Sequence, residues 1–373
     1  MHIPFIDLSR TVSTIKEDVI SDWQDCVDQC EFVGGERVRR FEERMTRDLG
    51  VNNFTGCASG TDALVVGLQA MGVKPGMRVA LPNMTFWAPY EAIVQVGAVP
   101  VLVDIDETDL QMDFDEFREA CERHDCGAAI LVHLYGWCSH RLAEFRSWSA
   151  DRGLHLIEDG AQAYGVRVDG ESVFSGAELG TLSFYPAKVL GAAGDGGGIT
   201  SLNPKISELV SALCNHGRAG HYTYDYVGWN SRMGGLQAAF LNRALDRIDG
   251  WMQSRREAEA FYQEFFSGRE DLCRIWRAPA GVGSNGYLNV IAPAQGGGDA
   301  VVAAMTARGI GCARTYPQTL DMQPPATGAL RVSGLEKSHR LSRDVVNLPL
   351  FAGITAEESR HAATTMLKVL EDG

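Results

Sequence analysis

Between about residues 50 and 200, short apolar runs alternate with stretches of helical character, and this rhythm constrains the fold more than any other feature of the chain. The runs are continuously apolar, which is typical of strands that are covered on both faces. A strand–helix–strand order implies right-handed crossovers and a mostly parallel sheet. We therefore predict an α/β protein whose mostly parallel central sheet lies between layers of helices. The strand candidates are 54–58, 78–81, 99–103, 128–133, 154–157, 181–185 and 198–202.

The rhythm changes after about residue 250, and the 373 residues are too many for one small core. A long helical stretch, with a break expected near Gly250, precedes a candidate strand at 287–291 and a C-terminal helix at 356–370. This second part is predicted to form a smaller α/β domain. The predicted division is a large domain over 13–250 and a small domain over 251–373, on which residues 1–12 also pack.

Charge and composition exclude several classes of protein. The net charge is −14 and no run of Lys or Arg stands out, which disfavours a nucleic-acid partner. No apolar run approaches the roughly 18–20 residues that span a bilayer, and residues 1–8 lack the pattern of a signal peptide. The nine cysteines complete no zinc spacing. We expect a cytoplasmic protein that acts on small molecules, with no metal and no membrane partner.

Ligands of an open parallel sheet bind beyond the carboxyl ends of its strands, so polar residues at those positions are the candidates for function. Ser59-Gly-Thr-Asp62 passes from a strand into a helix. Free backbone N–H groups there, with Gly60 allowing close approach, suit a phosphate. An ordinary helix cap by Ser59 or Thr61 is the alternative.

The segment 158–162 follows another candidate strand and carries Asp159 and Gln162. A carboxylate at a buried strand end is costly unless it meets a cation. A protonated pyridine nitrogen is such a cation, and its protonation makes the ring a better electron sink. Asp159 fits this role, while Gln162 could bond a ring hydroxyl. A helix cap is again the alternative.

Lys188 ends the stretch Ser183-Phe-Tyr-Pro-Ala-Lys188, directly before a glycine-rich turn at 191–198. Desolvation and nearby positive charge can keep such an amine neutral, and the neutral amine attacks an aldehyde. Ser183 could add a hydrogen bond to a phosphate. Taken by itself, Lys188 could equally be a solvated surface residue.

The stretch Pro82-Asn-Met-Thr-Phe-Trp87 places aromatic residues after a candidate strand. An aromatic ring at this position can cover one face of a flat cofactor, although core packing is the alternative. Phe86 is the preferred candidate, with Trp87 as the second choice.

In this order, the motifs resemble the DegT/StrS-type sugar aminotransferases, a branch of the fold type I pyridoxal-phosphate enzymes. The resemblance covers nearly the whole chain. The matching segments are Phe5-Ile-Asp-Leu8, Phe32-Val-Gly34, Ser59-Gly-Thr-Asp-Ala-Leu64, Thr85-Phe86, Glu158-Asp-Gly-Ala-Gln162, Ser183-Phe-Tyr-Pro-Ala-Lys188, Gly194-Asp-Gly-Gly197, Gly228-Trp-Asn-Ser-Arg-Met233, Leu236-Gln-Ala-Ala239 and Asn347-Leu-Pro-Leu350.

The resemblance implies pyridoxal 5′-phosphate as cofactor and Lys188 as the Schiff-base lysine that also moves the substrate proton. It implies that Asp159 pairs with the pyridine nitrogen and Gln162 with the ring oxygen. The residues implied to hold the phosphate are Gly60, Thr61 and Ser183. Asn230 in such enzymes reaches the phosphate of the neighbouring subunit, so a homodimer with shared active sites is expected.

Three positions depart from the pattern of the family. Tyr164 and Asp321 stand where histidines are common, and the segment 232–235 lacks the usual acidic residue. We expect these positions to lie on the substrate side of the site, where they affect the choice of sugar rather than the chemistry.

The activity implied is transfer of an amino group from an amino acid, L-glutamate by preference, to a keto group of a nucleotide-linked deoxy sugar. The opening Phe-Ile-Asp-Leu and the region of Trp251 favour the third carbon of the sugar over the fourth. An amino-cyclitol aminotransferase would share every motif. A sugar dehydratase of the family would carry histidine in place of Lys188. A ligand-sensing regulatory protein on the same fold is the alternative outside enzymes.

Overall fold

The computed structural model describes residues 1–372, which are built around one eight-stranded sheet in the order β1-β9-β8-β5-β4-β2-β3-β13. The pairs from β13 to β8 are all parallel, while β9 is antiparallel to both of its neighbours, β1 and β8. The prediction of a mostly parallel sheet is confirmed. The strands are β1 Thr55–Cys57, β2 Arg78–Pro82, β3 Val99–Val103, β4 Cys126–Val132, β5 His155–Asp159, β8 Leu179–Ser183, β9 Gly197–Ser201 and β13 Leu330–Arg331.

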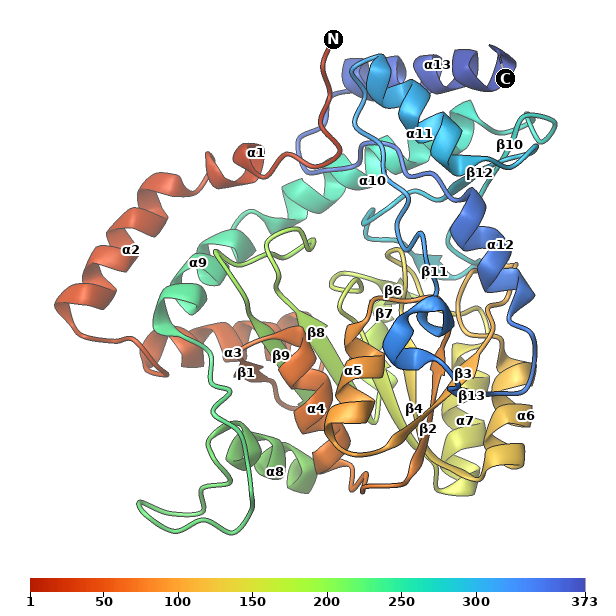
Figure 1. Ribbon diagram of the computed structural model, residues 1–373. Helices are drawn as coiled ribbons and strands as arrows, with labels where there is room; N and C mark the ends of the chain where they lie inside the picture. Colours follow the sequence, from red (N-terminus) through yellow and green to blue (C-terminus); the bar gives the residue numbers. More distant parts are fainter. Residues whose placement is uncertain (373) are drawn as a thin grey trace.

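Helices cover both faces of this sheet (Figure 1). Strand β4 shows why its sequence is continuously apolar. Ala129 and Leu131 pack into the core under α6 and α7, while Ala128 and Ile130 pack into the core under α4 and α5. Alternate side chains thus point to opposite faces of the sheet, and both faces are buried from solvent. The helices of the two layers are α4 Gly60–Ala70, α5 Ala88–Gln95 and α8 Pro204–Cys214 on one face, and α6 Phe114–His124 and α7 Leu142–Arg152 on the other.

A second group of helices flanks the end of the sheet that carries β1. Helices α2 (Lys16–Asp28) and α3 (Glu36–Asp48) both pack on α9 (Gly235–Leu245), and α10 (Ile248–Phe265) follows α9 directly. The break that was predicted near Gly250 therefore lies at residues 246–247. Gly250 is exposed inside α10, where a helix tolerates glycine at a modest cost.

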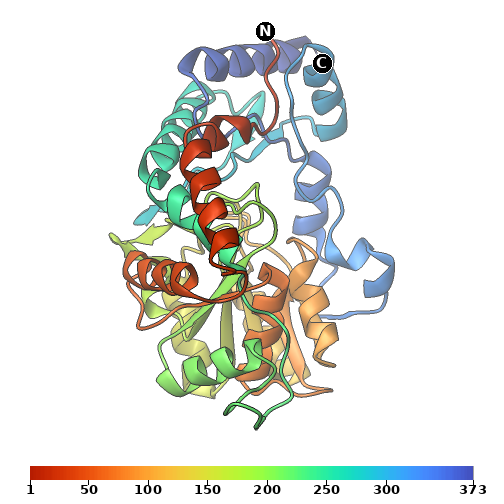
Figure 2. The same ribbon diagram turned by 90° about the vertical axis from the view of Figure 1, so that its left-hand side faces the viewer.

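The C-terminal part has its own hydrophobic core, which lies above the sheet in Figures 1 and 2. Ile3 is fully buried in this core and pairs with Ile310, so the N-terminus packs here as well. The division of the chain near residue 250 remains a prediction. The elements of this part are β10 Cys273–Ile275, β12 Ile291–Pro293, α11 Gly298–Ala307, α12 Glu336–Asp344 and α13 Ala356–Asp372.

The strand predicted over 287–291 is wrong except at its last residue. Leu288 donates its N–H to Tyr135 O at 3.3 Å, and the side chain of Asn289 bonds Leu348 O at 3.0 Å. These bonds turn the segment toward the mouth of the sheet, and pairing with β10 begins only at Ile291. The remaining short elements are α1 Ser9–Val12, β6 Arg167–Val168, β7 Glu171–Ser172 and β11 Val282–Gly283, with 3₁₀ turns at Val173–Gly176, Leu320–Met322 and Pro324–Ala326.

No helix within residues 1–372 combines the length and the apolar character that crossing a bilayer requires.

Candidate active site

A cavity of about 510 Å³ lies at the carboxyl ends of β5 and β8, where the argument from strand ends placed a ligand. The structure brings to its wall every residue that was predicted to hold a cofactor except Asn230. These residues are Gly60, Thr61, Phe86, Asp159, Gln162, Ser183 and Lys188.

The N-terminus of α4 forms one end of the cavity. The Ser59 side chain caps the helix by accepting a hydrogen bond from Asp62 N at 3.1 Å, which leaves the N–H groups of the first turn pointing outward. A Cβ on Gly60 would lie only 2.6 Å from the Cβ of Ser183. Only glycine therefore lets Ser183 approach the helix end. Free N–H groups, the helix dipole and two nearby hydroxyls, those of Thr61 and Ser183, suit a phosphate.

Asp159 forms the opposite, buried end and is only 5% exposed. Within the protein its carboxylate accepts a hydrogen bond from Ala161 N at 2.9 Å. Burial raises the pKa of Asp159, while the Ala161 N–H and the charge of Lys188 oppose that rise. A buried carboxylate that faces a cavity with so few partners fits a cationic group on the ligand.

A network of buried charges lies behind Asp159 on the same strand. Glu158 is fully buried and accepts two hydrogen bonds from Arg146, at 2.7 and 2.9 Å, and one from His133 at 2.9 Å. Burial alone would raise the pKa of Glu158, but the bonds to His133 and Arg146 hold it below its usual range. The two acidic residues at the end of β5 therefore differ: Glu158 is paired inside the protein, and Asp159 is available to a ligand.

Two hydrogen bonds hold the side chain of Gln162 in the wall of the cavity. Its Oε1 accepts a hydrogen bond from Tyr135 N at 2.6 Å, and its Nε2 donates to Tyr316 Oη at 2.6 Å. One N–H of the side-chain amide remains for a ligand. Tyr135 and Tyr316 both adopt positive φ, at 65° and 64°, which is unusual for bulky residues.

Lys188 lies on the segment between β8 and β9, and this segment is ordered by its own backbone. Lys188 N donates to Tyr185 O at 2.8 Å, and Phe184 N donates to Gly196 O at 2.8 Å. The Lys188 Nζ lies 5.3 Å from the centre of the Tyr287 ring. No carboxylate of residues 1–372 forms an ion pair with it, so the amine is available for chemistry.

Phe86 and Trp87 point to different places. Phe86 is 60% exposed and lines the cavity, whereas Trp87 stacks on Tyr90 with ring centres 4.7 Å apart. This arrangement favours Phe86 as the ring that covers a flat ligand.

Asn230 does not reach the cavity of its own chain. It is exposed, pairs with Asn215 and accepts a hydrogen bond from Arg232 Nη2 at 2.7 Å. The neighbouring Ser231 is buried and bonds Asp62 at 2.6 Å, which fixes this loop against α4.

Taken together, the wall of the cavity fits pyridoxal 5′-phosphate. A helix end that suits a phosphate, a buried carboxylate that suits a pyridinium nitrogen and a free lysine amine lie around one space. Two observations decide this fit: Gly60 has no room for a Cβ, and the carboxylate of Asp159 forms no ion pair within residues 1–372.

Four further residues of the cavity wall with aromatic or acidic side chains were not predicted as parts of the site: Tyr185, Asp195, Tyr287 and Tyr316. Tyr185 and Asp195 belong to motifs that were recognised, but nothing in their spacing assigned them a position. Tyr287 and Tyr316 come from irregular segments of the C-terminal part. Neither residue directly follows a strand of the central sheet, so a search for polar residues at strand ends does not reach them.

The three departures from the expected pattern lie in different surroundings. Tyr164 is buried, and its hydroxyl bonds Asp48 at 3.3 Å, away from the cavity. Asp321 accepts hydrogen bonds from Asn83 at 3.0 Å and from His339 at 2.9 Å, and thereby ties the loop that carries Tyr316 to the end of β2. Arg232 contacts Asn230, as described above.

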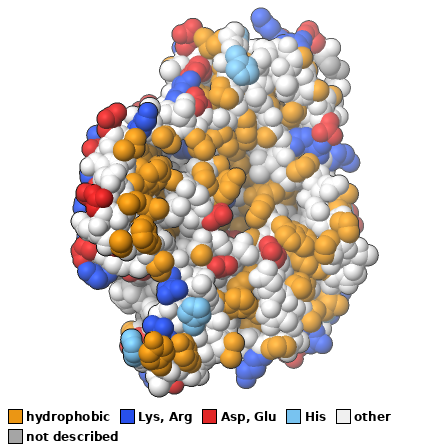
Figure 3. Space-filling model, turned by 60° about the vertical axis from the view of Figure 1, so that its left-hand side comes forward, with side chains coloured by type: hydrophobic (Ala, Val, Ile, Leu, Met, Phe, Trp, Pro, Cys, Tyr) orange, Lys and Arg blue, Asp and Glu red, His pale blue; other side chains and the backbone are white. Residues whose placement is uncertain are grey.

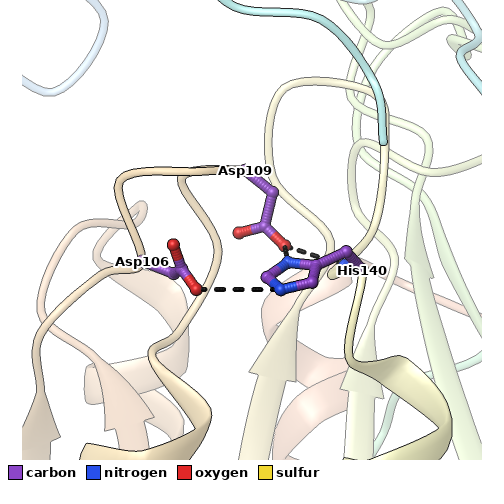
Figure 4. Close-up of side chains that lie close together, drawn as sticks. All are labelled: Asp106, Asp109 and His140. Carbon is purple, nitrogen blue, oxygen red and sulfur yellow. Dashed lines mark hydrogen bonds and ion pairs between the residues drawn. The ribbon is translucent and has the colours of Figure 1, made fainter. Parts of the chain in front are cut away.

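Within residues 1–372, one cluster has the composition of a metal site, formed by Asp106, Asp109 and His140 (Figure 4). Asp109 already accepts hydrogen bonds from His140 Nδ1 at 2.6 Å, His140 N at 2.8 Å and Gln111 N at 2.9 Å. These hydrogen bonds give the cluster a structural role, because they join the loop of Asp109 to the loop of His140.

Comparison with known proteins adds independent information. Residues 13–367 match the model of the DegT/DnrJ/EryC1/StrS aminotransferase family. The chain is 32% identical over 368 residues to a UDP-N-acetyl-3-dehydro-alpha-D-glucosamine 3-aminotransferase of Acidithiobacillus ferrooxidans, covering 99% of this chain and 98% of the relative. It is also 30% identical to a protein of Geobacillus stearothermophilus named a pleiotropic regulatory protein, covering 97% and 96% of the two chains.

Among solved structures, the chain is similar to DesV of S. venezuelae in complex with a ketimine intermediate. The TM-score is 0.94 at 27% identity, and the match covers 99% of both chains. The fold type that the sequence implied is confirmed.

Proposed function

This chain belongs to the DegT/DnrJ/EryC1/StrS aminotransferase family, and we propose that it transfers an amino group from an amino acid to the third carbon of a nucleotide-linked keto sugar. It is an aminotransferase, and the enzymes of this family use pyridoxal 5′-phosphate. The proposal concerns the two substrates and the role of each residue of the site.

The observation that carries the proposal is the convergence of Lys188, Asp159 and the N-terminus of α4 on one cavity. The bound cofactor supplies an electron sink and a temporary carrier for the amino group. Lys188 would hold the cofactor and then move the proton at the substrate carbon. Asp159 would keep the ring nitrogen protonated.

The other residues of the cavity would orient the cofactor. Gln162 would donate its remaining amide N–H to the ring oxygen, and Phe86 would cover one ring face. The N–H groups at Gly60, with the hydroxyls of Thr61 and Ser183, would bind the phosphate. The phosphate site and Asp159 would together fix the orientation of the cofactor in the cavity.

A nucleotide-linked sugar as acceptor is supported by the relative from A. ferrooxidans, whose name states a 3-aminotransferase acting on a UDP-linked amino sugar. We propose the same position, the third carbon, and L-glutamate as donor. The nucleotide and the other substituents of the sugar follow from neither the name nor the cavity.

We propose that the working unit is a cytoplasmic homodimer in which Asn230 of one copy completes the phosphate site of the other. Asn230 is exposed and does not line its own cavity, which supports this arrangement. Hydrophobic side chains also gather in patches around a hollow on one side of the molecule (Figure 3). Two segments carry several exposed hydrophobic residues: Ile20, Val27, Phe32 and Val33 in the first, and Tyr222, Tyr224, Tyr226, Val227 and Trp229 in the second. Exposed apolar surface of this kind is typical of an interface.

The test runs the second half-reaction in reverse. The cofactor-loaded enzyme is mixed with a panel of amino nucleotide-sugars, with the amino group at the third or the fourth carbon, and with amino-cyclitols. The expected result is loss of the visible absorbance of the cofactor with a 3-amino sugar. Reaction with amino-cyclitols alone, or with 4-amino sugars alone, would contradict the proposed substrate.

The same panel tests for a regulatory function, which is the function stated in the name of the G. stearothermophilus relative. A sensor would bind one of these ligands without turnover. Catalytic exchange of amino groups over many turnovers would exclude a purely regulatory role.

A further inference from the structure

A second cavity, of about 300 Å³, shares Lys188 with the first. Its walls come from six separate parts of the chain and are mostly apolar. The large side chains on the wall are Leu8, Val12, Trp23, Phe240, Trp251 and Phe351. Neither the predicted cofactor site nor the phosphate site uses this space.

One cation, Arg255 of α10, lies in this apolar wall and is only 6% exposed. Its Nη1 donates hydrogen bonds to Leu350 O at 3.1 Å and to Gly286 O at 3.5 Å. It forms no ion pair with any residue in the described part of the chain, 1–372. Gly286 precedes Tyr287, whose ring lies below the Lys188 amine, so Arg255 and Lys188 belong to one neighbourhood.

The unused edge of Arg255 is the edge with which Arg146 and Arg243 bind carboxylates. Arg146 presents Nε and Nη2 to Glu158 at 2.7 and 2.9 Å. Arg243 presents the same two nitrogens to Asp22 at 2.6 and 2.9 Å. In Arg255 only Nη1 is bonded, so the matching Nε–Nη2 edge is free for a bidentate partner.

Asp7, which supplies a carboxylate to the same wall, does not bind the Nε–Nη2 edge of Arg255. Asp7 accepts hydrogen bonds from Ser9 N at 3.0 Å and from Arg10 Nε at 3.1 Å. Burial lowers the pKa of the Arg255 guanidinium to about 10, because no anion offsets the loss of hydration. An anion from outside the chain would supply that offset.

We propose that the free edge of Arg255 binds a carboxylate of the amino-acid donor. The inference rests on the proposed function and adds to it the place where the donor is held. The donor nitrogen must reach the cofactor beside Lys188, and Lys188 and Arg255 line the same cavity. Apolar walls exclude water, so an ion pair formed there is strong and selective for a group that fits.

A carboxylate could also come from the other substrate, if the sugar is a uronic acid. The two sources share the chemistry of a bidentate ion pair, and the two half-reactions separate them. The donor half-reaction involves the amino acid alone, and the second half-reaction involves the sugar alone.

The first experiment measures binding of glutarate, an unreactive dicarboxylate, to the cofactor-loaded enzyme. Trp23 and Trp251 line the cavity, so their fluorescence reports on its occupation. Arg255→Met is expected to weaken glutarate binding by about tenfold to hundredfold, the usual effect of losing a charge-assisted pair. Equal binding by wild type and Arg255→Met would overturn the proposal, as would no binding to the wild type.

Arg256→Met is the matched control. Arg256 is the next residue on the same helix, and its guanidinium also bonds two backbone carbonyls, Ser284 O at 2.7 Å and Gly165 O at 3.1 Å, but it does not line the cavity. The control should lose comparable stability and keep its affinity for glutarate. An equal loss of affinity in both variants would show a general structural effect and reject the proposal.

The second experiment measures each half-reaction separately. In Arg255→Met, KM for the donor should rise by about tenfold or more, while the sugar half-reaction of the aminated enzyme stays unchanged. The opposite pattern would assign Arg255 to the sugar and overturn the proposal. If no sugar reacts but glutarate binding still depends on Arg255, the proposed sugar substrate fails and the carboxylate site stands.

Arg255→Met removes two buried hydrogen bonds that stabilise the fold, so Ala193→Leu provides a second test. Ala193 is exposed and lines the cavity, and a larger side chain there narrows it without touching the buried core. Glutarate binding should weaken in this variant too, and unchanged binding would contradict the proposed site.

Discussion

The two cavities that meet at Lys188 are built in opposite ways. The larger one takes most of its polar groups from turns that follow β1, β2, β5 and β8, so the strands fix most of these groups. The smaller one is enclosed by segments that are far apart in the sequence, from the N-terminus to residues 351–352. The first therefore depends on local sequence, and the second depends on how the C-terminal part and the N-terminus pack together.

The largest effect is expected from Lys188→Ala, which removes the residue that both cavities share. Turnover should fall by at least about 10³-fold, because the variant loses both the holding amine and the proton carrier. Borohydride treatment of the wild type should attach the cofactor to a peptide that contains Lys188. A folded variant with undiminished transamination, or a labelled peptide from elsewhere, would reject the assignment.

Asp159→Asn tests the larger cavity, in which Asp159 lies at the end of β5. Turnover should fall by about 10²-fold to 10³-fold, since an amide does not stabilise the protonated ring nitrogen. Pyridoxal-phosphate affinity is the second readout, and it should fall as well. Unchanged kinetics with all substrates would show that another group pairs with the ring.

The same variant has an expected effect on stability that runs the other way. Burial raises the pKa of Asp159 in the folded protein, so ionisation costs folding energy as pH rises above 3.8. The cofactor-free Asp159→Asn protein should therefore unfold at a higher temperature than wild type at neutral pH, and the difference should shrink toward pH 4. Thermal unfolding measured over this pH range checks the sign.

Gly60→Ala should weaken cofactor binding by about tenfold, because the added Cβ would push Ser183 away from the helix end. Gly250→Ala is its matched control, since nothing lies within 4 Å of a Cβ at that exposed helical position. The control should bind the cofactor normally and gain about 0.5–1 kcal/mol of stability. An equal loss of cofactor affinity in Gly60→Ala and Gly250→Ala would contradict the proposed phosphate site at Gly60.

The smallest effect concerns the packing that encloses the second cavity. Arg10 donates to Glu358 Oε2 at 2.8 Å and covers the Phe351 ring, with 5.0 Å from its Cζ to the ring centre. The hydrogen bond from Arg10 lowers the pKa of Glu358 to about 2. Glu358→Gln should cost roughly 0.5–1 kcal/mol at neutral pH, as expected for a partly screened pair.

The pH dependence of this cost follows from the direction of the shift. Glu358 is more acidic in the folded protein, so the stabilisation is present above pH 4.5 and is lost as pH falls toward 2. Unfolding by urea at pH 7 and at pH 3 should show the gap between wild type and variant closing. A gap that stays constant would show that the charge of Glu358 plays no part.

The sequence predicted most of the sheet and most of the polar wall of the candidate site, because both depend on short-range patterns. Apolar runs such as 99–103 became strands, and the residues after them reached the same edge of the sheet. Tyr287 and Tyr316 were not predicted as parts of the site because their positions are set by long-range bonds, such as that between Tyr316 and Gln162. The same is true of Arg255, whose neighbours on the cavity wall include residues from both ends of the chain.

The antiparallel direction of β9 has a mechanical consequence. Segment 184–196, which carries Lys188, starts and ends on adjacent strands of the same sheet, so the lysine is tethered at both ends to one rigid body. Arg255 lies on α10, which packs partly on the C-terminal core. Arg255 is held instead by hydrogen bonds to Gly286 O and Leu350 O, two carbonyls of the C-terminal part. The distance between the two cations is therefore set by how the C-terminal part packs against the sheet.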